Sequence, residues 1–205
     1  MQQFGSRRTD SNSFRPNHRP TTARHKVARP PLERLDGRVG EWGTVNDNPP
    51  QWRAFADSAI ELALEQAQLA PDYGDVPVGA VIFDSRTGAV IAAAHNRREA
   101  DSDPVAHAEL LALQQAATLT GQWRLSGFSL AVTLEPCLMC AGAAVNSRID
   151  AVAFGAFDLK AGAMGSLYHV GADPRLNHEI ETHGGLQADR CAALLVDFFA
   201  AKRDR

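Results

Sequence analysis

The chain has 205 residues, of which 44% are apolar and 22% are charged, as in ordinary globular proteins. This length suits one domain with an appendage, and no apolar run of about 18 residues predicts a transmembrane helix. The net charge of −3 is unevenly distributed: residues 1–48 carry nine Lys/Arg against five Asp/Glu, and residues 49–205 carry twelve against nineteen. The second segment is therefore not a basic nucleic-acid platform overall, and RNA binding there would need local positive charge.

Residues 1–48 are rich in Arg, Pro, Ser, Thr, Asn and Gly and show no periodic apolar pattern. Such a segment cannot bury enough apolar surface to offset its ordering entropy, so we expect it to be disordered. Its role stays open between an RNA-contacting arm, an organelle transit peptide, a dispensable tail and a start codon placed too far upstream. We expect the folded domain to occupy residues 49–205.

The first half of this domain reads as a helix followed by a hairpin. A helix is expected over 51–70, because apolar residues recur there at helical spacing: Trp52, Phe55, Ala59, Leu62 and Ala63. A buried strand over 78–83, a tight turn over 84–88 and a returning strand over 89–94 come next. A polar loop then runs from His95 to Pro104.

The second half alternates helices with strands. In chain order we expect a helix over 107–119, a strand over 128–134, a helix over 137–147, a strand over 151–154, a loop over 157–174, a short strand over 179–182 and a helix over 187–202. The last helix would place on its apolar side Cys191, Leu194, Leu195, Phe198 and Phe199. This order predicts a three-layer α/β/α domain, whose five-stranded sheet is mixed because its opening hairpin is antiparallel.

The three cysteines indicate metal or redox use rather than a disulfide framework. Their number is odd, Cys137 and Cys140 lie three apart, and no signal-peptide pattern precedes them. The reducing compartment that this implies keeps thiols free. Cys191 is flanked by Ala192, Ala193 and Leu194, so we expect it to be a core thiol.

Two short stretches carry the chemistry, His107-Ala108-Glu109 and Pro136-Cys137-Leu138-Met139-Cys140. Cys137 and Cys140 are i and i+3 in the first turn of a predicted helix, and His107 begins another helix. Two helix N-termini at one sheet edge would bring these side chains together. Thiolates and imidazole suit zinc, and three protein ligands leave a fourth position for water.

Glu109 reads better as a proton carrier than as a ligand. From the first turn of its helix it could reach the fourth zinc position, where zinc acidifies a water toward neutrality. Glu109 would take the proton of that water and return protons to a ring nitrogen and to the leaving amine. The product would be an oxo compound plus ammonia, so the expected reaction is a hydrolytic deamination.

Other interpretations compete for the Cys-x-x-Cys pair. Alone, it would equally fit a structural zinc site or a redox site, but dithiol exchange has no need of the His-x-Glu stretch. A closed structural site would want a fourth ligand, from Cys191 or another histidine. We expect the remaining histidines to be surface or packing residues: His18, His25, His95, His169, His178 and His183.

From about Phe55 to Lys202 the chain resembles the bacterial tRNA-specific adenosine deaminases, within the zinc-dependent cytidine/deoxycytidylate deaminase superfamily. The stretches that carry the resemblance are 75–81 (DVPVGAV), 95–97 (HNR), 103–104 (DP), 133–143 (TLEPCLMCAGA), 154–166 (FGAFDLKAGAMGS), 177–178 (NH) and 191–199 (CAALLVDFF). Residues 1–48 have no counterpart in the common bacterial form.

This resemblance implies a cytidine deaminase-like fold and a cytoplasmic homodimer with one zinc ion per subunit. It further implies conversion of adenosine to inosine at the wobble position of a tRNA anticodon, with an ACG-anticodon arginine tRNA as the expected substrate. A small-molecule guanine, cytosine or nucleoside deaminase is the enzymatic alternative. A non-catalytic, zinc-stabilised interaction module is the other.

Site residues carry over from the family position by position. The zinc ligands fall on His107, Cys137 and Cys140, and the proton shuttle falls on Glu109. Asn96 matches a residue that contacts the flipped adenine, since an amide can donate to and accept from a purine edge, and its alternative role is loop capping. Three more residues match positions that line the RNA path, with a solvated loop or a helix core contact as the alternative: Asp158, Lys160 and Phe199.

Overall fold

The structure, a computed structural model, describes residues 50–203, which belong to one compact unit. The expected disorder of residues 1–48 lies outside these described residues. Within residues 50–203, no helix combines the length and the apolar composition that a membrane span needs.

Five strands form a single sheet in the order β2-β1-β3-β4-β5. Their bounds are Gly79–Asp84 for β1, Val90–His95 for β2, Phe128–Leu134 for β3, Ala151–Ala156 for β4 and Glu181–Gly184 for β5. β1 pairs antiparallel with β2 and β3, whereas β3–β4 and β4–β5 are parallel pairs. The predicted mixed five-stranded sheet is therefore confirmed.

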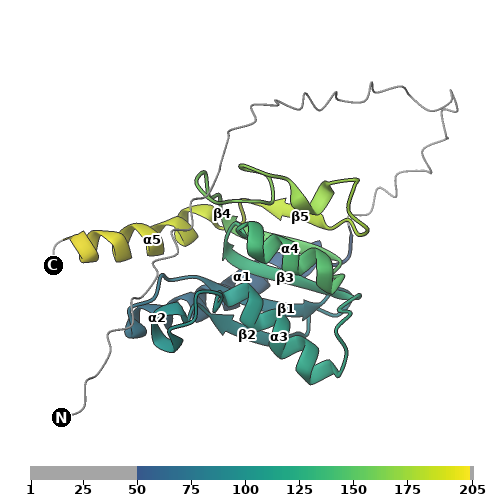
Figure 1. Cartoon of the computed structure of the whole chain (residues 1–205), viewed down its shortest axis with the longest axis horizontal. Helices are drawn as coiled ribbons and strands as arrows, with labels where there is room; N and C mark the ends of the chain where they lie inside the picture. The colour runs from purple at the N-terminus through teal and green to yellow at the C-terminus, as the bar shows by residue number, and fades with distance from the viewer. Residues whose placement is uncertain (1–49, 204–205) are drawn as a thin grey trace, which may run out of the picture. The chain divides into compact units, whose positions relative to one another are not determined.

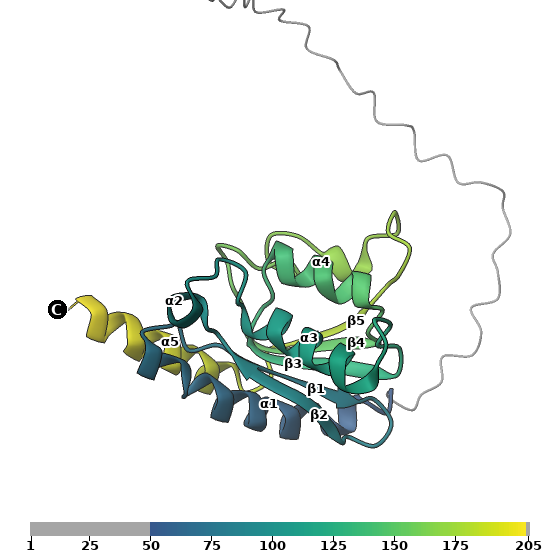
Figure 2. The same ribbon diagram turned by 60° about the horizontal axis from the view of Figure 1, so that its bottom comes forward.

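Helices cover both faces of the sheet (Figures 1 and 2). α1 (Arg53–Ala67) and α5 (Ala188–Arg203) pack on one face, and α3 (Ala108–Thr120) and α4 (Leu138–Ser147) lie on the other. Each face has its own core of buried apolar side chains, one containing Ile60 and Phe83, the other Leu113 and Phe154. The three-layer α/β/α prediction is thus confirmed.

The fifth strand was predicted two residues too early. It pairs in parallel with β4 from Glu181 opposite Ala151 to Gly184 opposite Phe154, while Ile180 is buried in the core just before the strand begins. Thr182 and His183 are polar, so no alternation of apolar residues marks the strand in the sequence. β4 also continues to Ala156, two residues beyond the expected end.

The predicted apolar side of α1 was partly wrong. Leu62 is 38% exposed, and Ile60 and Leu64 are the large buried side chains in its place. The expected apolar side of α5 was also only partly wrong: Cys191 is buried and Leu194 and Leu195 pack against the two cores, but Phe199 is 45% exposed. α5 contacts β4 and β3, and its C-terminal half then extends past the sheet (Figures 1 and 2), where Lys202 Nζ donates to Gly74 O (3.0 Å).

Short helical turns interrupt the expected loops. The polar loop after β2 contains α2 (Arg98–Asp101), and 3-10 turns occupy Ala70–Tyr73 and Val170–Ala172. α2 has four residues and none of them is buried, so no apolar periodicity announces it in the sequence.

The buried carboxylate of Glu135, directly after β3, organises the loop that follows β4. It accepts hydrogen bonds from the backbone nitrogens of Asp158 (3.1 Å), Met164 (3.0 Å) and Ser166 (2.9 Å), and a further one from the Ser166 hydroxyl. Gly162 leaves room for it, because a Cβ there would lie 2.3 Å from Glu135 Oε2. Burial raises the pKa of this carboxyl, but the hydrogen bonds outweigh burial and bring the pKa below its ordinary value of 4.5.

Glu135→Gln should therefore destabilise the protein by about 1–3 kcal/mol, because an amide replaces one acceptor oxygen by a donor that faces backbone N–H groups. The measurement is chemical denaturation at pH 7. Since the folded-state pKa of Glu135 is depressed, its stabilisation is complete above pH 4.5 and is lost as the pH falls through the lower folded value. The difference between wild type and variant should consequently shrink below pH 4.5.

Glu65→Gln is the matched control, because Glu65 is exposed on α1. Its unfolding free energy should stay within about 0.5 kcal/mol of the wild type. Equal stability of the Glu135 and Glu65 variants would show that the carboxylate does not organise the loop.

Candidate active site

Two helix N-termini bring His107, Cys137 and Cys140 together. His107 and Cys137 are the N-cap residues of α3 and α4, both with extended backbone, and neither side chain caps its own helix. His107 Nδ1 lies 3.8 Å from Cys137 Sγ and 3.6 Å from Cys140 Sγ, and the three atoms lie within 4.8 Å of one another. Tetrahedral zinc with bonds of about 2.3 Å to sulfur and about 2.0 Å to nitrogen separates such atoms by about 3.6 Å. The spacing therefore fits zinc.

The pKa values of these three side chains also indicate that the site is suited to bind a cation. The neighbouring Cys140 thiol lowers the pKa of Cys137 to about 3, with His107 adding to the effect. The proximity of Cys137, together with burial, raises the pKa of Cys140, and the contact with Cys137 raises the pKa of His107. Without a metal only one thiol ionises readily. A bound cation lets both ionise, because it removes the repulsion between two negative sulfurs.

Glu109 lies in the first turn of α3, two residues after His107, and is 4% exposed. Its Oε2 is buried and has no hydrogen-bond partner among the described residues. Burial raises the pKa of this carboxyl above its ordinary value, although its own backbone and the charge of His107 oppose the rise. A buried carboxylate oxygen without a partner is costly, so it marks a place where a ligand or water belongs.

Asn96 is 7% exposed and connects the loop before β1 to α3. Its Oδ1 accepts from the backbone nitrogen of Ala108 (2.9 Å), and its Nδ2 donates to Val76 O (3.1 Å). The capping role that the sequence left open is therefore present. One N–H and one lone pair of the amide remain, so the same side chain can still meet a substrate.

The other three predicted substrate contacts lie in two places. Asp158 Oδ1 accepts from the backbone nitrogens of Lys160 (2.9 Å) and Ala161 (3.1 Å), so Asp158 and Lys160 share one turn. That turn is tied to the metal-binding region through Glu135 and through the bridge between Cys137 and Gly162. Phe199 lies on α5 against Phe198, with ring centroids 5.3 Å apart, and no contact among the described residues ties it to the site.

The remaining histidines of the described chain make packing contacts or are exposed. His95 stacks on Tyr73, His183 lies edge-on to Trp52, and His178 Nε2 contacts Ile149 O at 2.7 Å. His169 is exposed. These four therefore hold the packing or surface positions that were expected, and His18 and His25 lie outside the described residues.

Two positioning acids were missed from the sequence, Glu135 and Asp75. Glu135 carried a usable signal, because a charged residue closes a strand that is otherwise apolar, directly before Pro136. Asp75 is 2% exposed but precedes the strand in a polar stretch, and nothing in the sequence distinguishes it from a solvated loop residue.

Comparisons with known proteins agree with this site. The sequence model of the family described as the cytidine and deoxycytidylate deaminase zinc-binding region matches residues 54–156. A tRNA-specific adenosine deaminase of Bacillus subtilis (strain 168) is 44% identical over 146 residues, 71% of this chain and 89% of that protein.

Solved structures share the fold. One comes from a study of A-to-I editing by tRNA:A34 deaminases at the wobble position of transfer RNA. It is 40% identical with a TM-score of 0.63, and the match covers 67% of this chain and 99% of that one. A guanine deaminase from Nitrosomonas europaea is 26% identical with a TM-score of 0.60, and the match covers 77% of this chain and 100% of the guanine deaminase chain. The chain therefore belongs to the zinc-binding cytidine and deoxycytidylate deaminase superfamily, and within it to the tRNA-specific adenosine deaminase family.

Proposed function

We propose that this protein converts adenosine to inosine at the wobble position of a tRNA anticodon by hydrolytic deamination. The observation that carries the proposal is the buried Oε2 of Glu109, which has no hydrogen-bond partner among the described residues and lies in the first turn of the helix that begins at the zinc ligand His107. With the three donor atoms of His107, Cys137 and Cys140 it would supply a metal position and a proton carrier in one region, and the relatives of this chain are named as acting on tRNA.

His107, Cys137 and Cys140 hold zinc in this proposal, one ion per subunit. Zinc, when bound, lowers the pKa of a water and so supplies a nucleophile at neutral pH. Glu109 would accept the proton of that water from the first turn of α3. It would pass this proton to N1 of the purine, then take the proton of the new C6 hydroxyl and pass it to the departing amine. A C6–O bond forms, the C6–N bond breaks, and adenosine plus water gives inosine plus ammonia.

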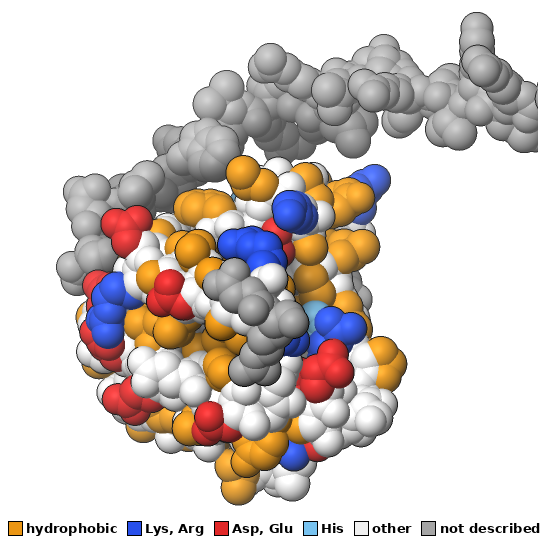
Figure 3. Space-filling model, turned by 90° about the vertical axis from the view of Figure 1, so that its left-hand side faces the viewer, with side chains coloured by type: hydrophobic (Ala, Val, Ile, Leu, Met, Phe, Trp, Pro, Cys, Tyr) orange, Lys and Arg blue, Asp and Glu red, His pale blue; other side chains and the backbone are white. Residues whose placement is uncertain are grey.

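The remaining site residues are proposed to hold the substrate. Asn96 offers its spare N–H and lone pair to the purine edge. Asp158 and Lys160 present a charged turn beside the site, and exposed Phe199 offers a ring for a splayed base. Figure 3 shows Lys and Arg side chains in separate groups among acidic and apolar ones, so the phosphate contacts on that face would be local.

Two alternatives are less well supported. A guanine deaminase shares the fold at 26% identity, against 40% for the tRNA:A34 deaminase structure. A non-catalytic zinc module has no use for Glu109, whose buried and unpaired carboxylate costs stability.

We further propose a cytoplasmic homodimer whose deaminase domain is residues 49–205 and whose tRNA substrate is the arginine tRNA with an ACG anticodon. Large apolar side chains in the first turn of α4 and in the loop after β4 are more than half exposed, which supports an interface there: Leu138, Phe157, Leu159, Leu167 and Tyr168. The bridge between Cys137 and Gly162 brings these segments side by side. Free thiols that must stay reduced suit the cytoplasm.

Glu109→Gln should lower the deamination rate by at least about 100-fold while the protein keeps its zinc, because proton transfer is lost and the three donor atoms stay in place. The melting temperature should be unchanged or higher, since the variant removes a buried unpaired carboxylate. Inosine formation, zinc content by mass spectrometry and thermal unfolding are the measurements. Exposed Glu179→Gln is the control, and retained activity of the Glu109 variant would contradict the mechanism.

The substrate test uses a full-length arginine tRNA transcript with an ACG anticodon. Sequencing should detect inosine at the wobble position and nowhere else, and a transcript with guanosine at that position should stay unchanged. Free guanine and cytidine are incubated in parallel. Turnover of either one without conversion of the tRNA would assign the protein to the small-molecule deaminases.

Deleting residues 1–48 should leave the deaminase domain folded, zinc-loaded and active. Light scattering should give a molar mass of two chains for both the full-length and the shortened protein. An unfolded product would contradict the domain boundary, and a molar mass of one chain for the full-length protein would contradict the homodimer.

A further inference from the structure

The segment between Asn96 and His107 forms a closed loop beside the metal centre. Two hydrogen bonds join its ends: Asn96 Oδ1 accepts from Ala108 N, and Arg97 N donates to Ala106 O (3.0 Å). Both ends of residues 97–106 are thereby fastened at the site, so the segment borders the approach to His107. Its middle contains α2, whose residues are all exposed.

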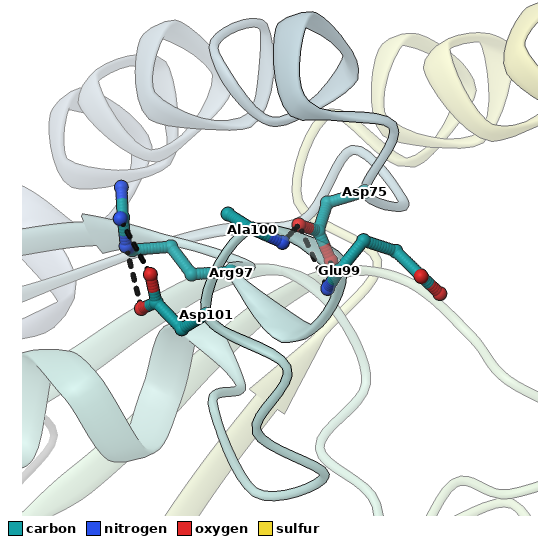
Figure 4. Close-up of polar contacts among 5 residues, drawn as sticks. All are labelled: Asp75, Arg97, Glu99, Ala100 and Asp101. Atoms are coloured by element: carbon teal, nitrogen blue, oxygen red, sulfur yellow. Dashed lines mark hydrogen bonds and ion pairs between the residues drawn. The ribbon is translucent and has the colours of Figure 1, made fainter.

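Asp75 fixes the backbone of this segment by hydrogen bonds. Its carboxylate is 2% exposed and accepts hydrogen bonds from the backbone nitrogens of Glu99 (3.0 and 3.2 Å) and Ala100 (3.1 Å). Figure 4 shows the Asp75 carboxylate directed at these two nitrogens, while the Glu99 side chain points away. Hydrogen bonds to an ionised acceptor are stronger than neutral ones, so this is the firmest attachment of α2.

The other contacts of α2 are weaker. Arg97 and Asp101 form an ion pair at 2.7 Å within the segment itself, with 38% and 39% of the two side chains exposed (Figure 4), and Arg97 also lies over the Tyr73 ring at 5.6 Å. Exposed ion pairs contribute little to stability. α2 also has no buried apolar side chain that would hold it by packing.

The same short stretch that contains Asp75 also supports Asn96. Val76 O accepts from Asn96 Nδ2, and Val78 O accepts from Asn96 N (3.0 Å). Residues 75–78 therefore hold both Asn96 and α2 by hydrogen bonds. These Asn96 contacts do not pass through α2, so Asn96 and His107 can keep their places when α2 loosens.

We propose that Asp75 is a positioning residue of the deamination, which fixes residues 97–106 as a rigid rim of the substrate entrance. The proposal rests on the proposed tRNA deamination. A rim that is already ordered spares the RNA the entropic cost of ordering it on binding. Losing Asp75 should therefore weaken substrate binding, while the metal centre and the chemical step stay intact.

The test compares Asp75→Ala with Asp75→Asn in the full-length protein. For Asp75→Ala we expect KM for the tRNA transcript to rise about tenfold, with kcat within about twofold of the wild type and unchanged zinc content. Asp75→Asn keeps an acceptor oxygen, so its KM should fall between those of wild type and Asp75→Ala. Hydrogen exchange of the Glu99 and Ala100 amides should accelerate at least about tenfold in Asp75→Ala.

Asp84→Ala is the matched control. Asp84 also accepts from two backbone nitrogens, those of Arg86 (2.9 Å) and Thr87 (2.8 Å), but in the hairpin turn between β1 and β2. Its loss should leave KM unchanged. Equal KM values for the Asp75→Ala and Asp84→Ala proteins, or a fall of kcat and zinc content with constant KM, would overturn the proposal. If the wild type converts no tRNA, the proposed function fails, whereas the amide exchange still decides whether Asp75 holds the rim.

Discussion

The chemistry of this protein depends on two helices that begin at the same edge of one sheet. α3 and α4 start with His107 and Cys137 in extended backbone, and Cys140 follows one turn later. Their donor atoms meet at the spacing of a tetrahedral zinc site. Everything that keeps the two helix starts in register with the sheet therefore also preserves the metal geometry, including the close approach of α5 to β4, where a Cβ on Gly155 would lie 2.3 Å from Cys191 Sγ.

Three buried acidic residues near this centre differ in how their carboxylate oxygens are hydrogen-bonded. Glu135 and Asp75 have their oxygens occupied by backbone N–H groups, and each fixes a loop that approaches the site from one side. Glu109 has one oxygen without a partner among the described residues, in the first turn of the helix that begins at His107. The two fully hydrogen-bonded carboxylates hold the loops around the site, and the carboxylate with an unbonded oxygen is available for proton transfer.

The sequence predicted those parts of the molecule that local pattern determines. Apolar periodicity identified the layers and the mixed sheet, and the spacing of His107, Cys137 and Cys140 identified the metal chemistry before any fold was known. It missed α2, whose four exposed residues depend on hydrogen bonds that their backbone donates to Asp75, more than twenty residues earlier. It also misjudged Phe199, because exposure on α5 depends on where the sheet ends and not on the residues of the helix.

If Asn96 meets the purine edge as proposed, the two hydrogen bonds that already hold its amide have a consequence for discrimination between purines. Because Oδ1 is fixed by the Ala108 N–H and Nδ2 by Val76 O, a flip of the amide would set donor against donor and acceptor against acceptor. The polarity of its two remaining hydrogen-bonding positions is therefore permanent. A ring that presents its own donor and acceptor in the reverse order meets a mismatch that no side-chain rotation can relieve.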